Sequence, residues 1–280
     1  MNRATEAAIW PEPEWNAERQ VFLGQCPVCD DPPHVLVGDS PGDLLEAYRA
    51  HDEEWHPRLP DKDLHGAALL DAFLSPVSKE ATWAKWAIRS YWWKYTGAAF
   101  DSLGHVDGAD SDPNSITATD IVAVSMLDVH VPGVAARTML DPSYGHDLHR
   151  LLVDVPHPLA LHDAEKADVT PGAPASQLWH KVLESGTGMG PTITSKLVAR
   201  KRPQLLPVYD TRLGYRLGIE RGTNDWLWWW QWWHDDPSRV AATRELRSAA
   251  GAAHEGAGCL DASLLRILDV AVWRYDKHFR

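Results

Sequence analysis

Cysteine is scarce in this sequence, with three residues in 280, namely Cys26, Cys29 and Cys259. Three cysteines are too few for a disulfide scaffold, which fits a reducing compartment. The sequence also lacks any run of about 18 uninterrupted apolar residues, which argues against a membrane-spanning helix. Its opening residues lack the apolar core of a secretory signal. We therefore expect a cytoplasmic protein.

Positive charge is also in short supply, because 27 Lys and Arg face 39 Asp and Glu, for a net charge of -12. Such a chain repels a DNA polyanion at long range, so any DNA contact must be local. The balance reverses between Gly186 and Arg221. The seven cations of this segment, set against Asp210 and Glu220, are Lys196, Arg200, Lys201, Arg202, Arg212, Arg216 and Arg221, giving 7 - 2 = +5. We interpret this segment as a local phosphate-binding surface, with a solvated basic helix face as the alternative.

Strand signals are sparse, and helical periodicity governs most of the chain. Residues 1–62 are rich in proline and acid, which predicts an irregular N-terminal extension. Residues 63–280 carry the periodicity of successive helices, so the fold class we expect is all-α. Thr117 followed by Asp120 predicts a capping box at the start of one of these helices.

Tryptophan is abundant, with 15 residues, six of them between positions 226 and 233. On a helix over 225–234, spacings of three and four residues place Trp226, Trp229, Trp230 and Trp233 on one stripe. We expect that stripe to be buried and Trp228 or Trp232 to be substantially exposed. An exposed indole favours a partner, which here would be a second copy of the chain or a stacked base.

A glycine hairpin at 186–190 is the most informative motif. Gly188 and Gly190 flank Met189, and two such glycines allow a tight turn at positive φ before the next helix begins. The amide groups at that helix start suit a phosphate. An ordinary link between helices explains the same three residues equally simply.

The order of motifs around the hairpin resembles the helix-hairpin-helix (HhH-GPD-like) DNA glycosylase superfamily. An apolar helix, Gly-Met-Gly, a second helix and then Pro207-Val-Tyr-Asp210 before a third helix carry the resemblance, over residues 176 to about 219. It implies a two-lobed helical fold, a catalytic aspartate at Asp210, and a monovalent cation bound by hairpin carbonyls. Thr192 stands where the lyase members have a lysine, which implies a monofunctional enzyme. Thr192, Lys196 and Arg200 join the hairpin as expected phosphate contacts.

A second resemblance covers about residues 80 to 280. Thr194-Ser-Lys-Leu-Val-Ala-Arg-Lys-Arg-Pro203 and Ser263-Leu-Leu-Arg-Ile-Leu-Asp-Val-Ala-Val-Trp273 resemble an uncharacterised bacterial domain-of-unknown-function family. This family brings no assigned activity. It therefore strengthens the expected fold and leaves the reaction open.

Asp210 is a candidate catalytic residue on chemical grounds that do not depend on the resemblance. Breaking an N-glycosidic bond builds positive charge on the sugar, which a fixed carboxylate in a dry pocket stabilises. Glycoside hydrolysis often employs a second carboxyl group, for which Asp120, Asp128 and Asp141 are the candidates. The alternative role of Asp210 is to cap the helix that starts at Thr211.

Base stacking and metal binding complete the predicted chemistry. The aromatic residues considered for stacking on an extruded base are Trp179, Tyr209, Trp92 and Trp93. Cys26 and Cys29 have the spacing of a zinc knuckle, but no second cysteine pair follows, so a plain turn is the alternative to a structural zinc site. The predicted reaction itself needs no cofactor.

Three functions remain open. The first is a monofunctional N-glycosylase acting on a nucleobase in DNA. The second is a noncatalytic DNA-binding or scaffolding module. The third is a small-molecule, nucleoside-like enzyme on the same helical body, which a basic cleft without room for a duplex would favour.

Overall fold

The computed structural model describes residues 14–16, 21–25, 35–40, 42–44, 46–47, 58–104, 112–219, 225–251 and 258–279. The chain divides into two compact units, Met1–Leu59 and Pro60–Arg280. The sequence predicts a boundary after residue 62. Each unit is described by itself below.

The first unit contains a small antiparallel sheet. Its strands are β1 (Glu14–Asn16), β2 (Val21–Gln25) and β3 (Val35–Gly38), in the order β1-β2-β3. Trp15 pairs with Phe22, and Leu23 pairs with Val37. The irregular extension predicted for residues 1–62 thus contains one small sheet among its described residues. The three strands themselves contain no proline, in keeping with the loss of a ladder hydrogen bond that proline would cause.

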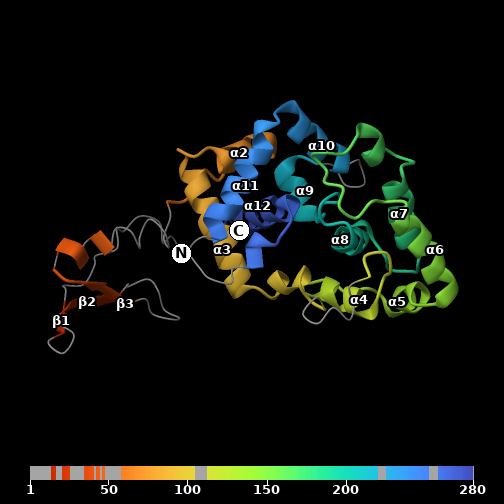
Figure 1. The fold of residues 1–280 in the computed structure, drawn as a ribbon, viewed down its shortest axis with the longest axis horizontal. Coiled ribbons are helices and arrows are strands. Elements are labelled where there is room, and N and C mark those ends of the chain that lie inside the picture. Colours follow the sequence, from red (N-terminus) through yellow and green to blue (C-terminus); the bar gives the residue numbers. More distant parts are fainter. Residues whose placement is uncertain are drawn as a thin grey trace. The chain divides into compact units, whose positions relative to one another are not determined.

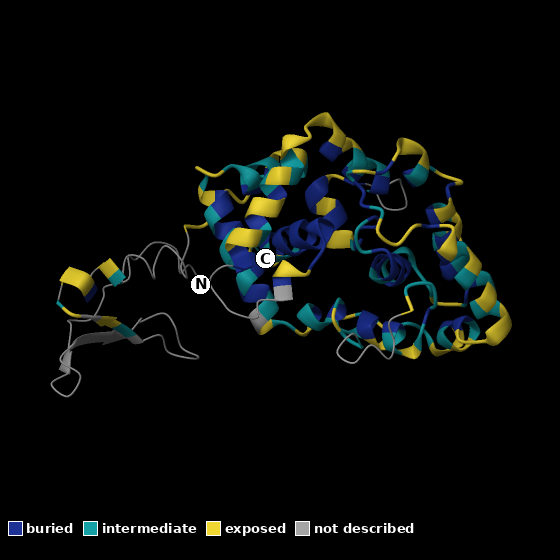
Figure 2. Ribbon diagram, viewed as in Figure 1, coloured by how far each residue is buried: buried dark blue, intermediate teal, exposed yellow. Residues whose placement is uncertain are grey.

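The second unit confirms the all-α prediction, and its helices form two groups (Figure 1). In the first group, α12 packs against α3, α9 and α11, and α2 packs against α3, α9 and α11. The bounds of these helices are α2 Gly66–Leu74, α3 Lys79–Lys94, α9 Thr211–Leu217, α11 Ser238–Gly251 and α12 Leu264–His278. Figure 2 shows α12 buried over most of its length, and every residue from Leu264 to Val272 is buried.

The second group is built on α8, which packs against α4 and α7. The helices are α4 Ala118–Ser125, α5 Gly133–Met139, α6 Pro142–Val153, α7 Pro174–Leu183 and α8 Pro191–Lys201. The predicted capping box is confirmed, since Thr117 accepts a bond from the Asp120 amide and the Asp120 side chain accepts one from the Thr117 amide. Short 3-10 helices complete the unit at η1 Thr96–Phe100, η2 Lys166–Val169 and η3 Gly258–Leu260. Among the described helices, none combines the length and the apolar character needed to cross a bilayer.

The tryptophan-rich helix is α10, Asp225–Asp235. The prediction for Trp232 is wrong: its ring is buried, its Nε1 donates to Asp71 Oδ1 at 3.2 Å, and Arg239 lies over its face. Trp230, predicted to be in the core, is half-buried and donates to the Ala164 carbonyl at 2.8 Å. Trp228 is half-buried as well. Helix α10 thus contacts residues of α2 and α11 and the Ala164 carbonyl, and none of its six indoles is fully exposed.

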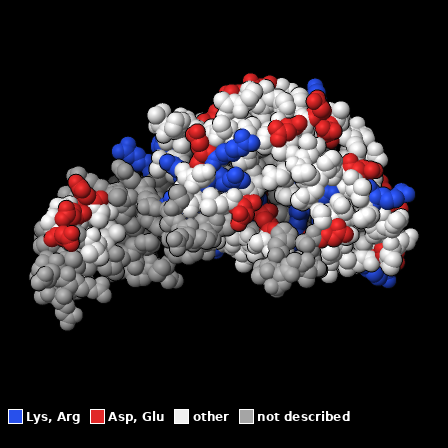
Figure 3. Space-filling model, viewed as in Figure 1, with Lys and Arg blue, Asp and Glu red and all other residues white. Residues whose placement is uncertain are grey.

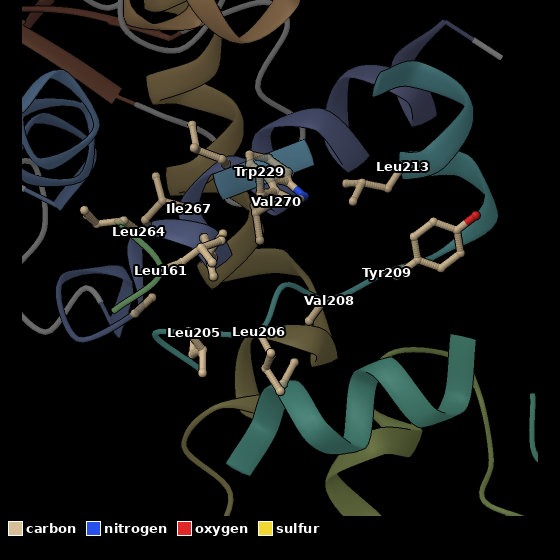
Figure 4. Packing of buried hydrophobic residues seen from close by; sticks show 14 of the residues in the cluster. Leu161, Leu205, Leu206, Val208, Tyr209, Leu213, Trp229, Leu264, Ile267 and Val270 are labelled. Atoms are coloured by element: carbon tan, nitrogen blue, oxygen red, sulfur yellow. The ribbon is translucent and has the colours of Figure 1, made fainter. Parts of the chain in front are cut away.

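The segment between α8 and α9 connects the two helix groups. Leu205, Leu206 and Val208 are buried in it, and Figure 4 shows them in the same close-packed region as Leu213 and Val270. This apolar anchoring fixes the backbone just before Asp210. The residue that begins α9 is therefore held in place by the core.

Candidate active site

A cavity of about 510 Å³ lies where the two helix groups meet. Its walls come from α3 and η1, from the turn after α4, and from α8, α9 and α12. The chemistry-bearing residues that line it are Asp128, Thr192, Lys196, Asp210, Arg212, Arg266, Asp269 and Lys277. The structure thus brings together Thr192, Lys196 and Asp210, which the sequence analysis singled out separately.

Asp210 both caps α9 and lines the cavity. Its Oδ1 accepts bonds from the amides of Arg212 at 2.9 Å and Leu213 at 2.8 Å. The position of Asp210 is therefore compatible both with capping α9 and with acting on a ligand in the cavity. Its Oδ2 makes no hydrogen bond to the described part of the chain, so one oxygen remains for a ligand. The cap holds the carboxylate in one orientation, as a preorganised electrostatic group requires.

A second carboxyl group, Asp269 on α12, lines the same cavity. It is buried and hydrogen-bonded to Arg266, one turn earlier on the helix. Burial raises the pKa of Asp269 to about 6, the Arg266 guanidinium opposes that rise, and the Asp210 carboxylate adds to it. Asp210 and Asp269 therefore interact electrostatically across the cavity. A carboxyl with a pKa near neutrality is suited to proton transfer.

Arg266 is held by four groups. It donates to Asp101 Oδ2 at 3.0 Å, to Asp269, to the Tyr91 hydroxyl at 2.7 Å and to the Gly97 carbonyl at 3.1 Å. These bonds leave the guanidinium little freedom to move. The orientation of Asp269 follows from that of Arg266.

Lys196 lies in the interior, only 4% exposed, and its Nζ donates to the Leu127 carbonyl at 2.9 Å. Burial lowers the pKa of its ammonium group, while the carboxylates of Asp210 and Asp269 act in the opposite direction. The next residue after Leu127, Asp128, adopts a left-handed conformation with φ 58° and lines the cavity. The turn after α4 thus supplies both a carbonyl partner for Lys196 and a third carboxyl group.

The hairpin glycines differ from each other. Gly188 has φ +89°, as predicted, whereas Gly190 is extended at φ -130° and is the N-cap of α8. The prediction of positive φ is therefore wrong for Gly190. Gly186 has a separate requirement, because a Cβ atom there would lie 2.9 Å from the backbone nitrogen of Ala135. Met189 packs partly buried against the core.

Most of the described cations of the basic segment are enclosed by protein groups, whereas Arg212 is exposed. Arg200 pairs with Asp120 at 2.8 Å and donates to the carbonyls of Phe100 and Leu103. Lys201 also pairs with Asp120, at 3.0 Å. Arg202 is completely buried and bonds to backbone carbonyls, including that of Val155. Lys196 and Arg200, which the sequence predicts as phosphate contacts, thus have protein partners in this structure, and their contact with phosphate stays a prediction.

The residues considered as the second carboxyl group lie in three different places. Asp120 forms the ion cluster with Arg200 and Lys201, and Asp141 caps α6. Asp128 is in the cavity. Sequence reasoning missed Asp269, although one signal was present. A charged pair at Arg266 and Asp269, three residues apart within the otherwise apolar stretch Leu264–Trp273, indicates ions that are buried together.

Of the aromatic residues considered for base stacking, the described side chains of Trp92, Trp179 and Tyr209 do not line this cavity. Trp92 lines a neighbouring cavity of about 790 Å³. Trp179 donates from Nε1 to Ser195 Oγ at 3.3 Å, and Tyr209 is buried. Trp93 has a side chain outside the described residues. The rings that line the cavity with Asp210 are Tyr91, Tyr95 and Trp273.

No group of three or more His, Cys, Asp and Glu side chains within the described residues has a geometry that could hold a metal ion. Cys26 and Cys29 lie outside those residues, so the zinc prediction stays a prediction. Cys259 is buried as a thiol. The monovalent cation at the hairpin also stays a prediction.

Comparison with known proteins places the chain in a family. The model of a family of unknown function, DUF6308, matches residues 84–276. The chain belongs to that family. The DUF6308 match includes Lys196, Asp210 and Asp269, and it confirms the second resemblance seen in the sequence. No curated protein and no solved structure matches the chain.

Proposed function

We propose that this protein hydrolyses an N-glycosidic bond between a nucleobase and a sugar, in the cavity that contains Asp210 and Asp269. The observation that carries the proposal is the pairing of two differently placed carboxyl groups. Asp210 is fixed by two amide hydrogen bonds, and Asp269 is buried against Arg266. The resemblance of the hairpin region to the helix-hairpin-helix glycosylases supports the same reaction.

The proposed reaction divides the work between the two carboxyl groups. As the bond from C1′ to the base nitrogen breaks, its electron pair leaves with the base and positive charge develops on the sugar. The Asp210 carboxylate stabilises that charge. A water molecule adds its oxygen to C1′ and passes a proton to the Asp269 carboxylate, whose pKa near 6 suits a base at neutral pH. The proton then returns to the departed base or to solvent.

Release of free base tests this proposal. Nucleosides, nucleoside 5′-monophosphates and DNA with modified bases are each incubated with the protein, and the free base is separated by chromatography. Asp210→Asn keeps the helix cap and the shape of the cavity but removes the charge. We expect ligand binding to persist and base release to fall by at least about a hundredfold. If the variant releases base at the parent rate, Asp210 is a cap alone.

One observation favours a second candidate, an N-glycosylase whose lysine forms a Schiff base with C1′ of the sugar and so allows elimination at the C3′–O bond. Lys196 lies in the cavity, and burial lowers its pKa, which makes the amine a better nucleophile. Because Lys196 is hydrogen-bonded to Leu127 and Thr192 occupies the position that the resemblance gives to a lysine, we propose the monofunctional reaction. Borohydride should therefore trap no covalent adduct between protein and substrate. An adduct that disappears in Lys196→Ala would establish the second candidate instead.

A further inference from the structure

We infer that the ligand of this cavity is a small nucleoside monophosphate, whose phosphate binds Arg212 and Lys277 at the rim, and not a base within duplex DNA. This inference rests on the proposed function for the position of the sugar. It makes a separate claim about what the cavity recognises. Three observations carry it: the location of the cations, the two rim side chains, and the charge balance of the cavity.

The cations that could have bound a DNA backbone are mostly committed elsewhere. Within 186–221, those buried or bonded to protein groups are Lys196, Arg200, Lys201, Arg202 and Arg216. On the face of residues 60–280 drawn in Figure 3, acidic and basic side chains are interspersed and form no extended basic surface. Duplex binding needs several neutralised phosphates, particularly against a net charge of -12.

Two cations at the cavity remain available. Arg212 is exposed in the first turn of α9, and its guanidinium forms no ion pair within the described part of the chain. Lys277 is exposed in the last turn of α12, with its Nζ 4.5 Å from the Tyr95 ring centroid and 4.8 Å from that of Trp273. Both side chains line the cavity and are long enough to move toward an anion.

The charge of the cavity suits one anionic ligand. Asp128, Asp210 and Asp269 face four cations, which are Lys196, Arg212, Arg266 and Lys277, so the fully ionised lining carries 4 - 3 = +1. Lys196 and Arg266 are bonded in the interior, which leaves the rim pair for a phosphate. A single phosphate monoester, which carries about -1.5 to -2 at neutral pH, brings the total to roughly -0.5 to -1. The negative charge of a polyanion such as DNA would greatly exceed the positive charge of the cavity lining.

The same arrangement assigns the other parts of the ligand. A sugar over Asp210 and Asp269 leaves the Trp273 ring of the same cavity for the base, once Lys277, which lies over that ring, has moved to the phosphate. Aromatic side chains bind bases by stacking, largely regardless of base identity. The volume of about 510 Å³ falls within the range of small-molecule sites.

Binding measurements separate this inference from the proposed reaction. Titration calorimetry compares 2′-deoxynucleoside 5′-monophosphates with the corresponding nucleosides, and a short DNA duplex is added as a competitor. In the Arg212→Gln/Lys277→Gln variant, affinity for the monophosphates should fall roughly tenfold to a hundredfold, while affinity for the nucleosides should not change. The duplex should not compete at equal phosphate concentration.

A matched control is Arg150→Gln/Lys166→Gln, which removes one exposed arginine and one exposed lysine that lies over a ring, Trp230, outside the cavity. It should leave all affinities unchanged. Equal binding of nucleosides and monophosphates, or effective competition by the duplex, overturns the inference. If the monophosphates bind as expected and no base is released, the inference holds and the proposed hydrolysis fails.

Discussion

Asp269 is the residue on which the pH behaviour of the proposed reaction depends. It is protonated below its pKa of about 6 and ionised above it, so only the higher range provides a base. The rate of base release should therefore rise as the pH passes through about 6 and level off above it. Asp269→Asn should lower the plateau and remove this rise. A parent profile that falls as pH increases through 6 would assign Asp269 the opposite role, that of an acid.

At the residue scale, sequence reasoning found half of the candidate site. Asp210 was predictable because a helix-starting aspartate after Pro-Val-Tyr has local signals in the chain. Asp269 lies 59 positions later, on another helix, and its proximity to Asp210 depends on how α9 packs against α12. The local sequence pattern does not predict how these two helices pack. Lys196 was predicted to contact phosphate, and its burial was missed. That burial likewise depends on a residue distant in the sequence, since the partner of Lys196 is the Leu127 carbonyl.

The hairpin before α8 provides a test at the scale of an element. Gly188 has φ +89° and little space, since a Cβ atom would lie 3.1 Å from Pro132 Cγ. Gly190 has extended backbone and open space around it. Gly188→Ala should lower the free energy of unfolding by about 1–3 kcal/mol, and Gly190→Ala should change it by less than about 1 kcal/mol. Denaturant unfolding of the two variants measures the difference, and equal losses would contradict the assigned conformations.

Helix α10 gives a second test at this scale. Trp232 is buried and bonded to Asp71, so Trp232→Gln should cost about 3–5 kcal/mol of stability, the range for removing a buried indole. Trp228 is half-buried, and Trp228→Gln should cost less than half as much. The midpoints of denaturant unfolding report both values. If Trp228→Gln destabilised the protein more than Trp232→Gln does, the orientation described for helix α10 would be contradicted.

Helix periodicity predicted the elements well and their neighbours poorly. The tryptophan stripe was derived for a helix with one buried face, but α10 also packs against η2 and receives Asp71 and Arg239 from α2 and α11. Because α10 contacts neighbours on a second face, Trp232 is buried, although a pattern with one buried face predicts that it is exposed. The same reason explains α8, where Arg200 and Lys201 turn inward to Asp120 of α4.

For the whole molecule, the decisive feature is where its charge resides. The sequence shows a basic segment in an acidic chain, and that contrast suggested an exposed nucleic-acid surface. The fold instead uses most of those cations to satisfy interior carbonyls and Asp120, because α8 is enclosed by its own helix group. Composition reports how much charge is present. Its placement follows from tertiary packing alone.

The cavity at the meeting of the two helix groups is the central claim about the molecule, and Asp210 tests it most directly. Asp141 provides a matched control, since its Oδ1 also accepts two amide bonds at a helix start, from Ser143 and Tyr144, but it does not line the cavity. The measurement is the rate of base release by Asp210→Asn and Asp141→Asn, with both variants shown to be folded. The account predicts a loss of at least about a hundredfold for Asp210→Asn and the parent rate for Asp141→Asn. Equal rates in the two variants would contradict it.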